Sequence, residues 1–335
     1  MKISILKPYC YSAQGGKPNQ EDSLFPPQDA ATEQTRVFMV CDGMGGHEHG
    51  EVASASVAET IGSMTALQPL CSTSEMQGCF EEALQQAYLN LDELDHTDSL
   101  RKMGTTLTFL AICTDGVLVA HIGDSRVYQL RPGKGVIFQT RDHSLVNDLI
   151  AAGEISEEQA RTHPRRNIIT RAIQPHQEYP AKAAYTILRD IKKGDILFLC
   201  CDGVVEQLDN NDLCNYLLNE KPLEERLSAV RDACAARDTR DNNTAYLIEV
   251  AEAECEEGSD EEVLLHIAED VTKPVPVPSK CDWAKNRRLW IGVAIFVAVA
   301  ILLCTLLSSS SNAKKDGRQD PPKSGQTLAP IHRNR

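Results

Sequence analysis

The chain has 335 residues, of which 42% are apolar and 24% are charged, so it is long enough for one large globular domain or two smaller ones. Its formal net charge of −14 argues against a nucleic-acid-binding protein, which normally presents a basic face. The twelve cysteines form no CxxC pair, so a reduced, intracellular protein is favoured over a disulfide scaffold. A zinc site is the less favoured alternative for so many cysteines.

Apolar runs predict strands, and apolar residues at helical spacing predict helices, throughout residues 1–252. In chain order we expect a strand at Val37–Cys41, helices at Glu51–Met64 and Ser74–Leu94, strands at Thr106–Cys113, Val117–Ile122, Arg126–Leu130, Val136–Gln139 and Ile196–Cys201, a helix from Leu223, and a strand at Ala245–Val250. The strands come in clusters instead of alternating with helices. This order favours antiparallel sheets with helices packed outside over a doubly wound parallel fold.

The C-terminal quarter differs in composition from the rest. Residues 289–307 carry no charge, and such a run of 19 residues predicts a transmembrane helix, with a buried core helix as the less favoured alternative. Residues 253–288 form an acidic and proline-rich juxtamembrane linker, and residues 308–335 a disordered tail. Basic residues before the span and the absence of a recognisable signal peptide predict a single-pass protein of the cell inner membrane, with residues 1–252 in the cytoplasm.

Four acidic motifs lie far apart within residues 1–252, most of them beside an apolar strand. They are Glu21-Asp22, Asp42-Gly43, Asp202-Gly203 and Asp241-Asn242. Carboxylates at strand ends are held on a rigid scaffold but emerge from it, which suits hard divalent cations that prefer oxygen ligands. A single Asp-Gly pair is more often only a turn, so the argument depends on the four motifs together.

Two other kinds of site fit the sequence poorly. The glycines between Gly43 and Gly50 match neither the GxGxxG pattern nor the phosphate-binding GxxxxGK[ST] pattern. His47 and His49 are not one helical turn apart, so they do not form the HExxH motif of zinc proteases. Nucleotide binding and zinc-protease activity are therefore not favoured.

Seven short motifs follow one another in an order that resembles a known family. They are Asn19–Asp22, Val40–Gly46, Gly104–Thr106, Gly123–Tyr128, Thr140–Ser144, Cys201–Gly203 and Asp241–Thr244. Together they span nearly all of residues 10–250 and resemble the type 2C, metal-dependent serine/threonine protein phosphatases in their bacterial, membrane-anchored form. The resemblance implies an α+β fold of two packed antiparallel β-sheets flanked by helices, an α-β-β-α sandwich, with a binuclear Mn²⁺ or Mg²⁺ centre at one edge.

The resemblance also implies a role for each acidic motif. Asp42 would bridge the two cations, and Asp202 and Asp241 would complete the ligands of one ion. Glu21 and the carbonyl group of Gly43 would hold the other. Two such cations make hydroxide available near neutral pH and neutralise the phosphoryl oxygens, so water attacks directly and no protein nucleophile is needed.

Three further acidic residues have weaker assignments. By resemblance, Asp22 would orient the attacking water, and Asp124 together with Asp202 would hold a third ion. Asp124 has the alternative of capping a turn or pairing with Arg126. Glu206 is expected to be a solvated helix residue and not a ligand.

The chain departs from the family pattern at two positions. The family usually has an arginine that clamps the substrate phosphate four residues before the motif glutamate, and here that position is Lys17, which cannot form a bidentate fork. Eukaryotic members have a histidine after the Asp-Gly pair, where this chain has Met44. The proton donor to the leaving group is therefore unassigned, with His47 and His49 as the weaker candidates.

A segment between His143 and Gly194 corresponds to the region that covers the site in such enzymes. His163–Asn167 and Arg171 supply cations there, which could steer an anionic phosphopeptide or only balance the acidic surface.

These observations predict a phosphatase that acts on phosphoserine and phosphothreonine in proteins and that works opposite a serine/threonine kinase. One alternative is a catalytically weak scaffold that binds phosphoproteins, but such a protein should lack metal carboxylates, and none is missing. The other is a phosphatase dedicated to one regulatory partner, although such enzymes usually carry sensor domains. The sequence makes no prediction about oligomeric state.

Overall fold

The computed structural model describes residues 2–45, 49–96 and 102–254, and all the helices and strands below belong to one compact unit. The predicted span at 289–307, the tail at 308–335 and nearly all of the linker at 253–288 lie outside these residues. Within the described ranges, no helix has the length and apolar character that a membrane crossing requires.

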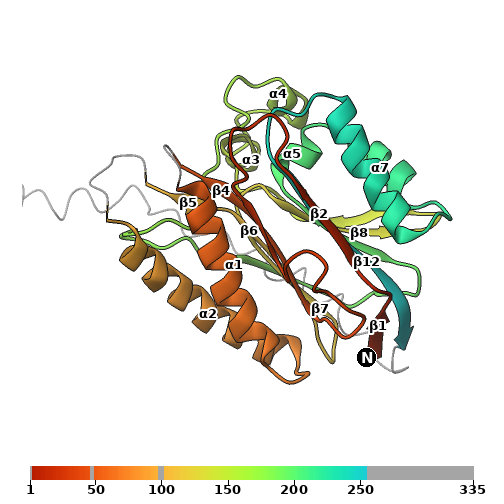
Figure 1. Cartoon of the computed structure of the whole chain (residues 1–335). Coiled ribbons are helices and arrows are strands. Elements are labelled where there is room, and N and C mark those ends of the chain that lie inside the picture. The colour runs from red at the N-terminus through yellow and green to blue at the C-terminus, as the bar shows by residue number, and fades with distance from the viewer. Residues whose placement is uncertain (1, 46–48, 97–101, 255–335) are drawn as a thin grey trace, which may run out of the picture. The chain divides into compact units, whose positions relative to one another are not determined.

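The strands form two antiparallel sheets, as the sequence predicts (Figure 1). The first sheet contains, in spatial order, β1 (Lys2–Ile5), β12 (Asn243–Glu254), β11 (Ile196–Cys200), β8 (Arg126–Arg131) and β9 (Gly135–Gln139), with β2 (Tyr9–Ala13) also paired to β12. The second contains β10 (Ala184–Leu188), β7 (Val117–Ile122), β6 (Leu107–Ile112), β4 (Val37–Met44) and β3 (Asp22–Phe25), with β5 (Gly104–Thr105) paired to β4.

The two sheets pack face to face, and strand β4 shows how. Because successive side chains of a strand point to opposite faces, Phe38 and Val40 enter the core shared with the first sheet. Val37, Met39 and Cys41 face the other way, into a second core. The strand is therefore buried on both faces, which explains why it reads as a continuous apolar run.

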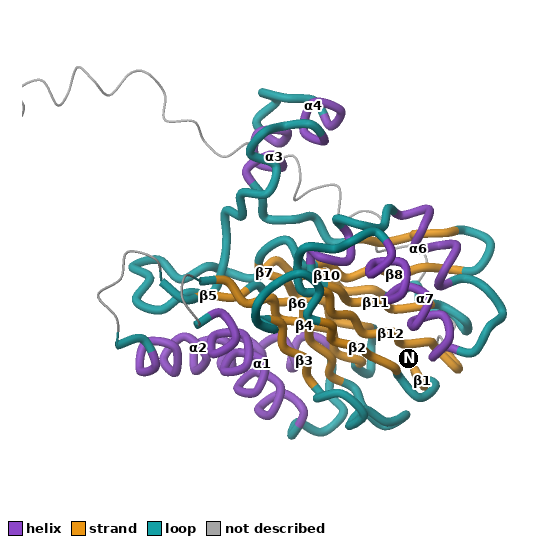
Figure 2. Tube along the Cα trace, turned by 45° about the horizontal axis from the view of Figure 1, so that its top comes forward, coloured by secondary structure: helices purple, strands orange, loops and turns teal. Residues whose placement is uncertain are grey.

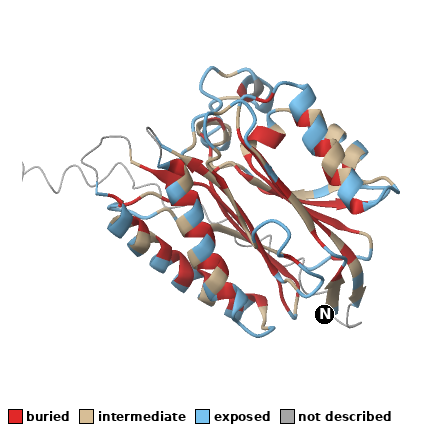
Figure 3. Cartoon of the chain, viewed as in Figure 1, coloured by how far each residue is buried: buried red, intermediate tan, exposed pale blue. Residues whose placement is uncertain are grey.

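Helices cover the outer face of each sheet (Figures 2 and 3). Helices α1 (Gly50–Ala66) and α2 (Thr73–Leu94) pack on the second sheet, and α6 (Asn210–Leu217) and α7 (Leu223–Ala236) pack on the first. Helix α2 begins with a capping box, because Ser72 accepts from the backbone N–H of Glu75 while the Glu75 side chain accepts from that of Ser72. The predicted order of helix, sheet, sheet and helix is confirmed for the described residues.

The predicted strands and long helices are all present, and most of their ends agree within two residues. Five strands were not predicted, namely β1, β2, β3, β5 and β10. They are two to five residues long and lie at or near sheet edges or beside β12 or β4, so they lack the long apolar run that marks a doubly buried strand. Strand β12 also continues to Glu254, beyond the predicted end at Val250.

Residues 140–183 form a projecting segment between β9 and β10, which carries α3 (Leu145–Ala151) and α4 (Glu157–Arg161) (Figure 2). Its base is closed by backbone hydrogen bonds from Leu145 N–H to the carbonyl of Ile168 (2.9 Å) and from Thr170 N–H to that of His143 (2.8 Å). This is the segment that the resemblance places over the site.

A pair of stacked histidines lies beneath this base. The rings of His121 and His143 are 4.6 Å apart and nearly parallel, and His143 Nδ1 accepts from the backbone N–H of Gly123 at 3.1 Å. Burial lowers the pKa of His121, and burial, His121 and Arg171 lower the pKa of His143 to about 4. Both rings are therefore neutral at neutral pH.

A buried ionic cluster connects β8 to the turn before β11. Asp195 is fully buried and accepts from Arg131 Nε at 2.7 Å, Arg131 Nη2 at 2.8 Å, Gln129 Nε2 at 2.8 Å and the backbone N–H of Lys192 at 2.9 Å. Both oxygens of the carboxylate accept hydrogen bonds, so removal of this one side chain leaves several buried donors without a partner.

We expect Asp195→Ala to lower the free energy of unfolding by about 3–5 kcal/mol, because it leaves the Arg131 guanidinium buried without its main partner. Chemical denaturation of the two proteins measures the difference. Asp232→Ala is the matched control, because Asp232 is an exposed carboxylate that also pairs with an arginine, Arg231. A loss no larger than that of the control would contradict this account of Asp195.

The histidine pair predicts a dependence of stability on pH. The unfolded pKa of histidine is about 6.5, and the folded pKa of His143 is about 4, so the folded state binds fewer protons between these values. Its contribution to stability is complete above pH 6.5 and falls as the pH drops towards 4. His143→Gln should therefore show a shallower acid-side decline in unfolding free energy than wild type, whereas His96→Gln, at an exposed position, should not. An unchanged slope in His143→Gln would refute the interpretation.

Candidate metal centre

The acidic motifs converge at the edge where the two sheets meet. Asp22 begins β3 and is the direct cross-strand partner of Asp42 on β4. From the first sheet, Asp202 begins the short helix α5 (Asp202–Val205) directly after β11, and Asp241 stands two residues before β12. Both sheets therefore contribute predicted metal ligands.

The glycine after each aspartate is required for space and not for an unusual backbone angle. A Cβ on Gly43 would lie 2.2 Å from the carbonyl oxygen of Gly50 and 2.4 Å from that of Glu21. A Cβ on Gly203 would lie 2.0 Å from the carbonyl oxygen of Asn242. The Asp-Gly motifs thus bring neighbouring backbones into contact behind the carboxylates, which is a physical reason for that pattern.

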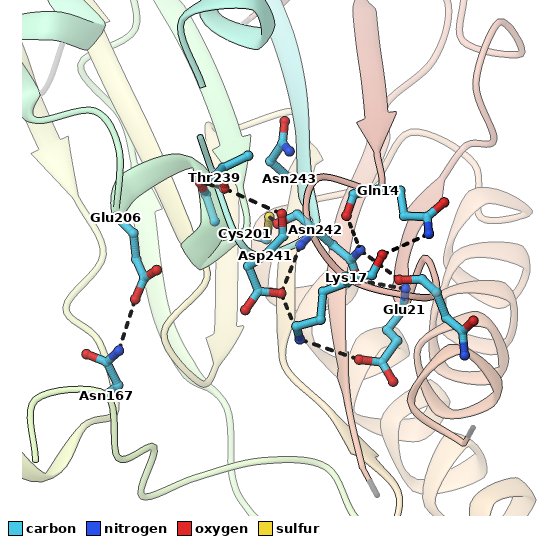
Figure 4. A network of polar contacts seen from close by, with 12 residues as sticks. Gln14, Lys17, Glu21, Asn167, Cys201, Glu206, Thr239, Asp241, Asn242 and Asn243 are labelled. Carbon is cyan, nitrogen blue, oxygen red and sulfur yellow. Dashed lines mark hydrogen bonds and ion pairs between the residues drawn. The ribbon is translucent and has the colours of Figure 1, made fainter. Parts of the chain in front are cut away.

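Asn242 holds the N-terminal loop against β12, and sequence reasoning assigned it no role. Its side chain is almost fully buried, and its Oδ1 accepts from the backbone N–H of Glu21 at 2.8 Å. Its Nδ2 donates to the carbonyl groups of Gln14 at 2.8 Å and Asn19 at 2.9 Å (Figure 4). The motif Asp241-Asn242 contained this residue, but no local pattern indicates that its amide joins segments more than 220 positions apart.

Several carboxylate oxygens in the centre are buried without a hydrogen-bond partner. They are both oxygens of Asp22, Oδ1 of Asp124 and Oδ1 of Asp202. Burial, followed by repulsion from neighbouring carboxylates, raises the pKa of Asp22 and of Asp124 to about 7 and also raises the pKa of Asp42 and Asp202. Buried, mutually repelling and unpartnered oxygens form the environment that a divalent cation stabilises, so these residues fit a metal ion.

Lys17 lies against two of the predicted ligands. Its ammonium is 2.8 Å from Asp241 Oδ1 and 3.6 Å from Glu21 Oε2 (Figure 4). The pKa of Lys17 is raised, because the hydrogen bond to Asp241 and the charges of Asp241, Glu21 and Asp42 outweigh the effect of burial, which lowers it. The clamping of a phosphate by Lys17 stays a prediction.

The potential metal-ligand atoms that lie nearest to one another include one from a residue that the sequence did not suggest as a ligand. One ligand atom from each of Asp22, Asp42 and Cys201 lies within 4.8 Å of the other two. The sequence places Cys201 at the end of a predicted apolar strand, and it is indeed fully buried. However, its Sγ accepts from the backbone N–H of Thr244 at 3.1 Å and lies 3.5 Å from the carbonyl oxygen of Asn242. Its sulfur is therefore part of the polar centre.

Asp124 follows β7 and forms no ion pair with Arg126. The alternative of an Asp124–Arg126 pair is therefore wrong. Arg126 makes two hydrogen bonds of 2.7 Å to Asp142. Asp124 instead lines a cavity of about 1010 Å³ that also reaches Asp202. This cavity separates the centre from the projecting segment at residues 140–183.

Glu206 is exposed at the C-terminal end of α5, as the sequence predicts. It lines the same cavity, and its Oε1 accepts from Asn167 Nδ2 of the projecting segment at 3.0 Å (Figure 4). Of the two candidate proton donors, His47 lies outside the described residues. His49 is exposed at the start of α1, and its side chain makes no capping hydrogen bond there.

Comparison with known proteins agrees with this arrangement. A model of the protein phosphatase 2C family matches residues 12–242. The protein phosphatase PhpP of Streptococcus pneumoniae is 31% identical over 220 residues, which are 66% of this chain and 88% of that protein. The serine/threonine phosphatase of S. agalactiae has a similar structure, with a TM-score of 0.64 and 30% identity, covering 73% of this chain and 99% of that one. The catalytic domain of the phosphatase PstP, solved with two manganese ions, has a TM-score of 0.59 and 26% identity, covering 74% of this chain and 100% of that one.

The residues matched by the family model include every predicted metal ligand, from Glu21 to Asp241. The two-sheet fold and the carboxylates at its edge are consistent with that match. The chain therefore belongs to the protein phosphatase 2C family, and the relatives named above are protein phosphatases.

Proposed function

We propose that this enzyme hydrolyses phosphoserine and phosphothreonine in proteins with a binuclear Mn²⁺ or Mg²⁺ centre. The observation that carries the proposal is the set of buried, unpartnered carboxylate oxygens on Asp22, Asp124 and Asp202, next to Asp42. Membership of the phosphatase family and the two manganese ions of the related PstP catalytic domain support the same chemistry.

We assign the two ions to the ligands that the family resemblance implies. By that resemblance, Asp42 would contribute to both ions, Asp202 and Asp241 would complete one, and Glu21 with the Gly43 carbonyl would hold the other. Asp124 with Asp202 would hold a third ion. When bound, the ions activate a water molecule and neutralise charge on the phosphoryl oxygens. Oxygen donors of this kind favour Mn²⁺ and Mg²⁺.

The protein's own groups prepare the site in three ways. The carboxylate of Asp22 is held by the β3–β4 pairing and offers two free oxygens to orient the attacking water. Lys17 supplies a cation at the same edge, where it can contact a phosphate oxygen as a point charge. The cavity between the centre and the projecting segment gives room for the peptide that carries the phosphate.

The cavity wall has a mixed charge. Apart from the centre itself and the Arg126–Asp142 pair, it presents the carboxylates of Glu157 and Glu206 and the guanidinium groups of Arg141 and Arg166. Electrostatic steering of a phosphopeptide by the projecting segment therefore remains a proposal that depends on its arginines.

The location and partners of the enzyme are proposed from sequence alone. We propose that residues 289–307 anchor the chain in the inner membrane with the catalytic unit in the cytoplasm, and that a serine/threonine kinase generates its substrates. A phosphoprotein-binding scaffold without activity is disfavoured, because every carboxylate of the centre is present. A phosphatase dedicated to one partner would use the same chemistry.

The full-length chain should release phosphate from a phosphothreonine peptide in the presence of Mn²⁺ and lose this activity with a chelator. Asp42→Asn and Asp202→Asn should each reduce kcat/KM by roughly 10²-fold or more, because they remove ligand charge without changing side-chain volume. Circular dichroism controls for folding. Absence of metal-dependent phosphate release from the folded wild-type chain would reject the proposed function.

Lys17 should act on both substrate and metal binding. Lys17→Ala is expected to raise KM for the phosphopeptide by removing the cation, and Lys17→Arg to preserve or improve it by offering a bidentate fork. Steady-state kinetics at saturating Mn²⁺ separates the effect on substrate from that on metal. If Lys17→Ala has the KM and kcat of wild type, Lys17 does not clamp the phosphate.

Asn242 should support metal binding without touching a metal. Asn242→Ala releases Glu21 and the N-terminal loop from β12, so affinity for Mn²⁺ should fall by roughly 10–100-fold, as is usual for groups that orient ligands. Calorimetric titration with Mn²⁺ measures this affinity. Asn219→Ala is the matched control, because the Asn219 amide also donates to two backbone carbonyl groups but lies at the end of α6. Equal Mn²⁺ affinity in both variants would contradict the assignment.

A further inference from the structure

A sulfur donor lies inside the carboxylate centre. Cys201 stands between β11 and α5, and its Sγ, one oxygen of Asp22 and one oxygen of Asp42 all lie within 4.8 Å of one another. Among the described residues, these three form the one group of potential metal-ligating side chains whose donor atoms lie this close together. Figure 4 shows the Cys201 sulfur beside the Asp241-Asn242 turn.

The aspartate opposite this sulfur provides an independent observation. Asp22 is 7% exposed, and neither of its oxygens has a hydrogen-bond partner. Its position is fixed by pairing with Asp42, while the backbone of Cys201 is fixed by a hydrogen bond from its N–H to the carbonyl of Thr244 at 3.1 Å. The three donors are thus presented by rigid strands of both sheets.

The chemistry of this set differs from that of the oxygen-only centre. A thiolate with two carboxylates is a donor set for zinc, whereas Mg²⁺ and Mn²⁺ prefer oxygen alone. Zinc–sulfur and zinc–oxygen bonds of about 2.3 Å and 2.1 Å bring tetrahedral ligands to roughly 3.5 Å from one another. The three donor atoms lie within 4.8 Å of one another, so zinc binding requires them to move closer together.

We propose that Cys201, Asp22 and Asp42 form a zinc-binding mode that competes with the Mn²⁺ or Mg²⁺ centre. Zinc binding replaces the S–H bond of Cys201 with an S–Zn bond and releases the proton to solvent. The backbone N–H of Thr244 stays in place to donate to the resulting thiolate. Asp42 belongs to both arrangements, so zinc binding draws its carboxylate towards Cys201 and weakens the binding of the catalytic ions.

Cobalt reports directly on the proposed sulfur bond. Co²⁺ occupies zinc sites, and a thiolate ligand gives a charge-transfer absorption band in the near ultraviolet. The full-length wild-type chain titrated with Co²⁺ should develop this band, and Cys201→Ser should lose it. Cys200→Ala is the matched control, because Cys200 is the adjacent, fully buried cysteine outside the donor group, and this variant should keep the band. No band in wild type, or a band that survives in Cys201→Ser, would overturn the proposal.

Metal selectivity gives a second test that is insensitive to partial loss of folding. The ratio of Zn²⁺ to Mn²⁺ affinity, measured by calorimetry on the same sample, should fall by at least about tenfold in Cys201→Ser. An unchanged ratio contradicts the proposal. If the variants do not fold, zinc X-ray absorption of wild type decides: one sulfur neighbour supports the site and none rejects it. These readouts do not need phosphatase activity, so the zinc site and the proposed function can fail separately.

Discussion

The structure depends on a fold that keeps several carboxylates close together although they repel one another. Four aspartates, the buried Asp22 and the half-buried Asp42, Asp124 and Asp202, lie at the meeting edge of two sheets. Removal from water and mutual repulsion raise the pKa of all of them. No local element could keep such groups in place, because each would turn towards water. The paired strands of both sheets, packed over a common apolar core, provide the rigidity that makes the cluster stable and ready for cations.

The second constraint is close contact between backbones behind these carboxylates. Gly43 and Gly203 allow neighbouring chains to approach more closely than any side chain would permit, and Asn242 bonds the N-terminal loop to the last strand. The ligands are therefore positioned by main-chain contacts and one buried amide instead of by long side chains. This explains why the short motifs of the family are so widely separated in the sequence but act as one unit.

The sequence predicted the parts that a local pattern encodes. Doubly buried strands such as β4 and β11 read as apolar runs, and the resemblance named Asp42 and Asp202 from their motifs. Short strands such as β3 lacked the pattern. The contacts of Cys201 and Lys17 could not be predicted, because they involve distant segments: the sulfur lies beside Asp22 and Asp42, and the ammonium is paired with Asp241. Pairing across two sheets is a property of the assembled fold.

The position of β12 has a consequence for how the protein is made. This last strand lies between β11 on one side and the first two strands, β1 and β2, on the other, so it joins the beginning of the chain to its end. On the ribosome, the first sheet cannot close until residues near 254 have emerged, and the earlier segments must wait with exposed apolar faces. The centre that Asp241 and Asn242 complete is therefore assembled late, and a chain that terminates before Asp241 cannot build it.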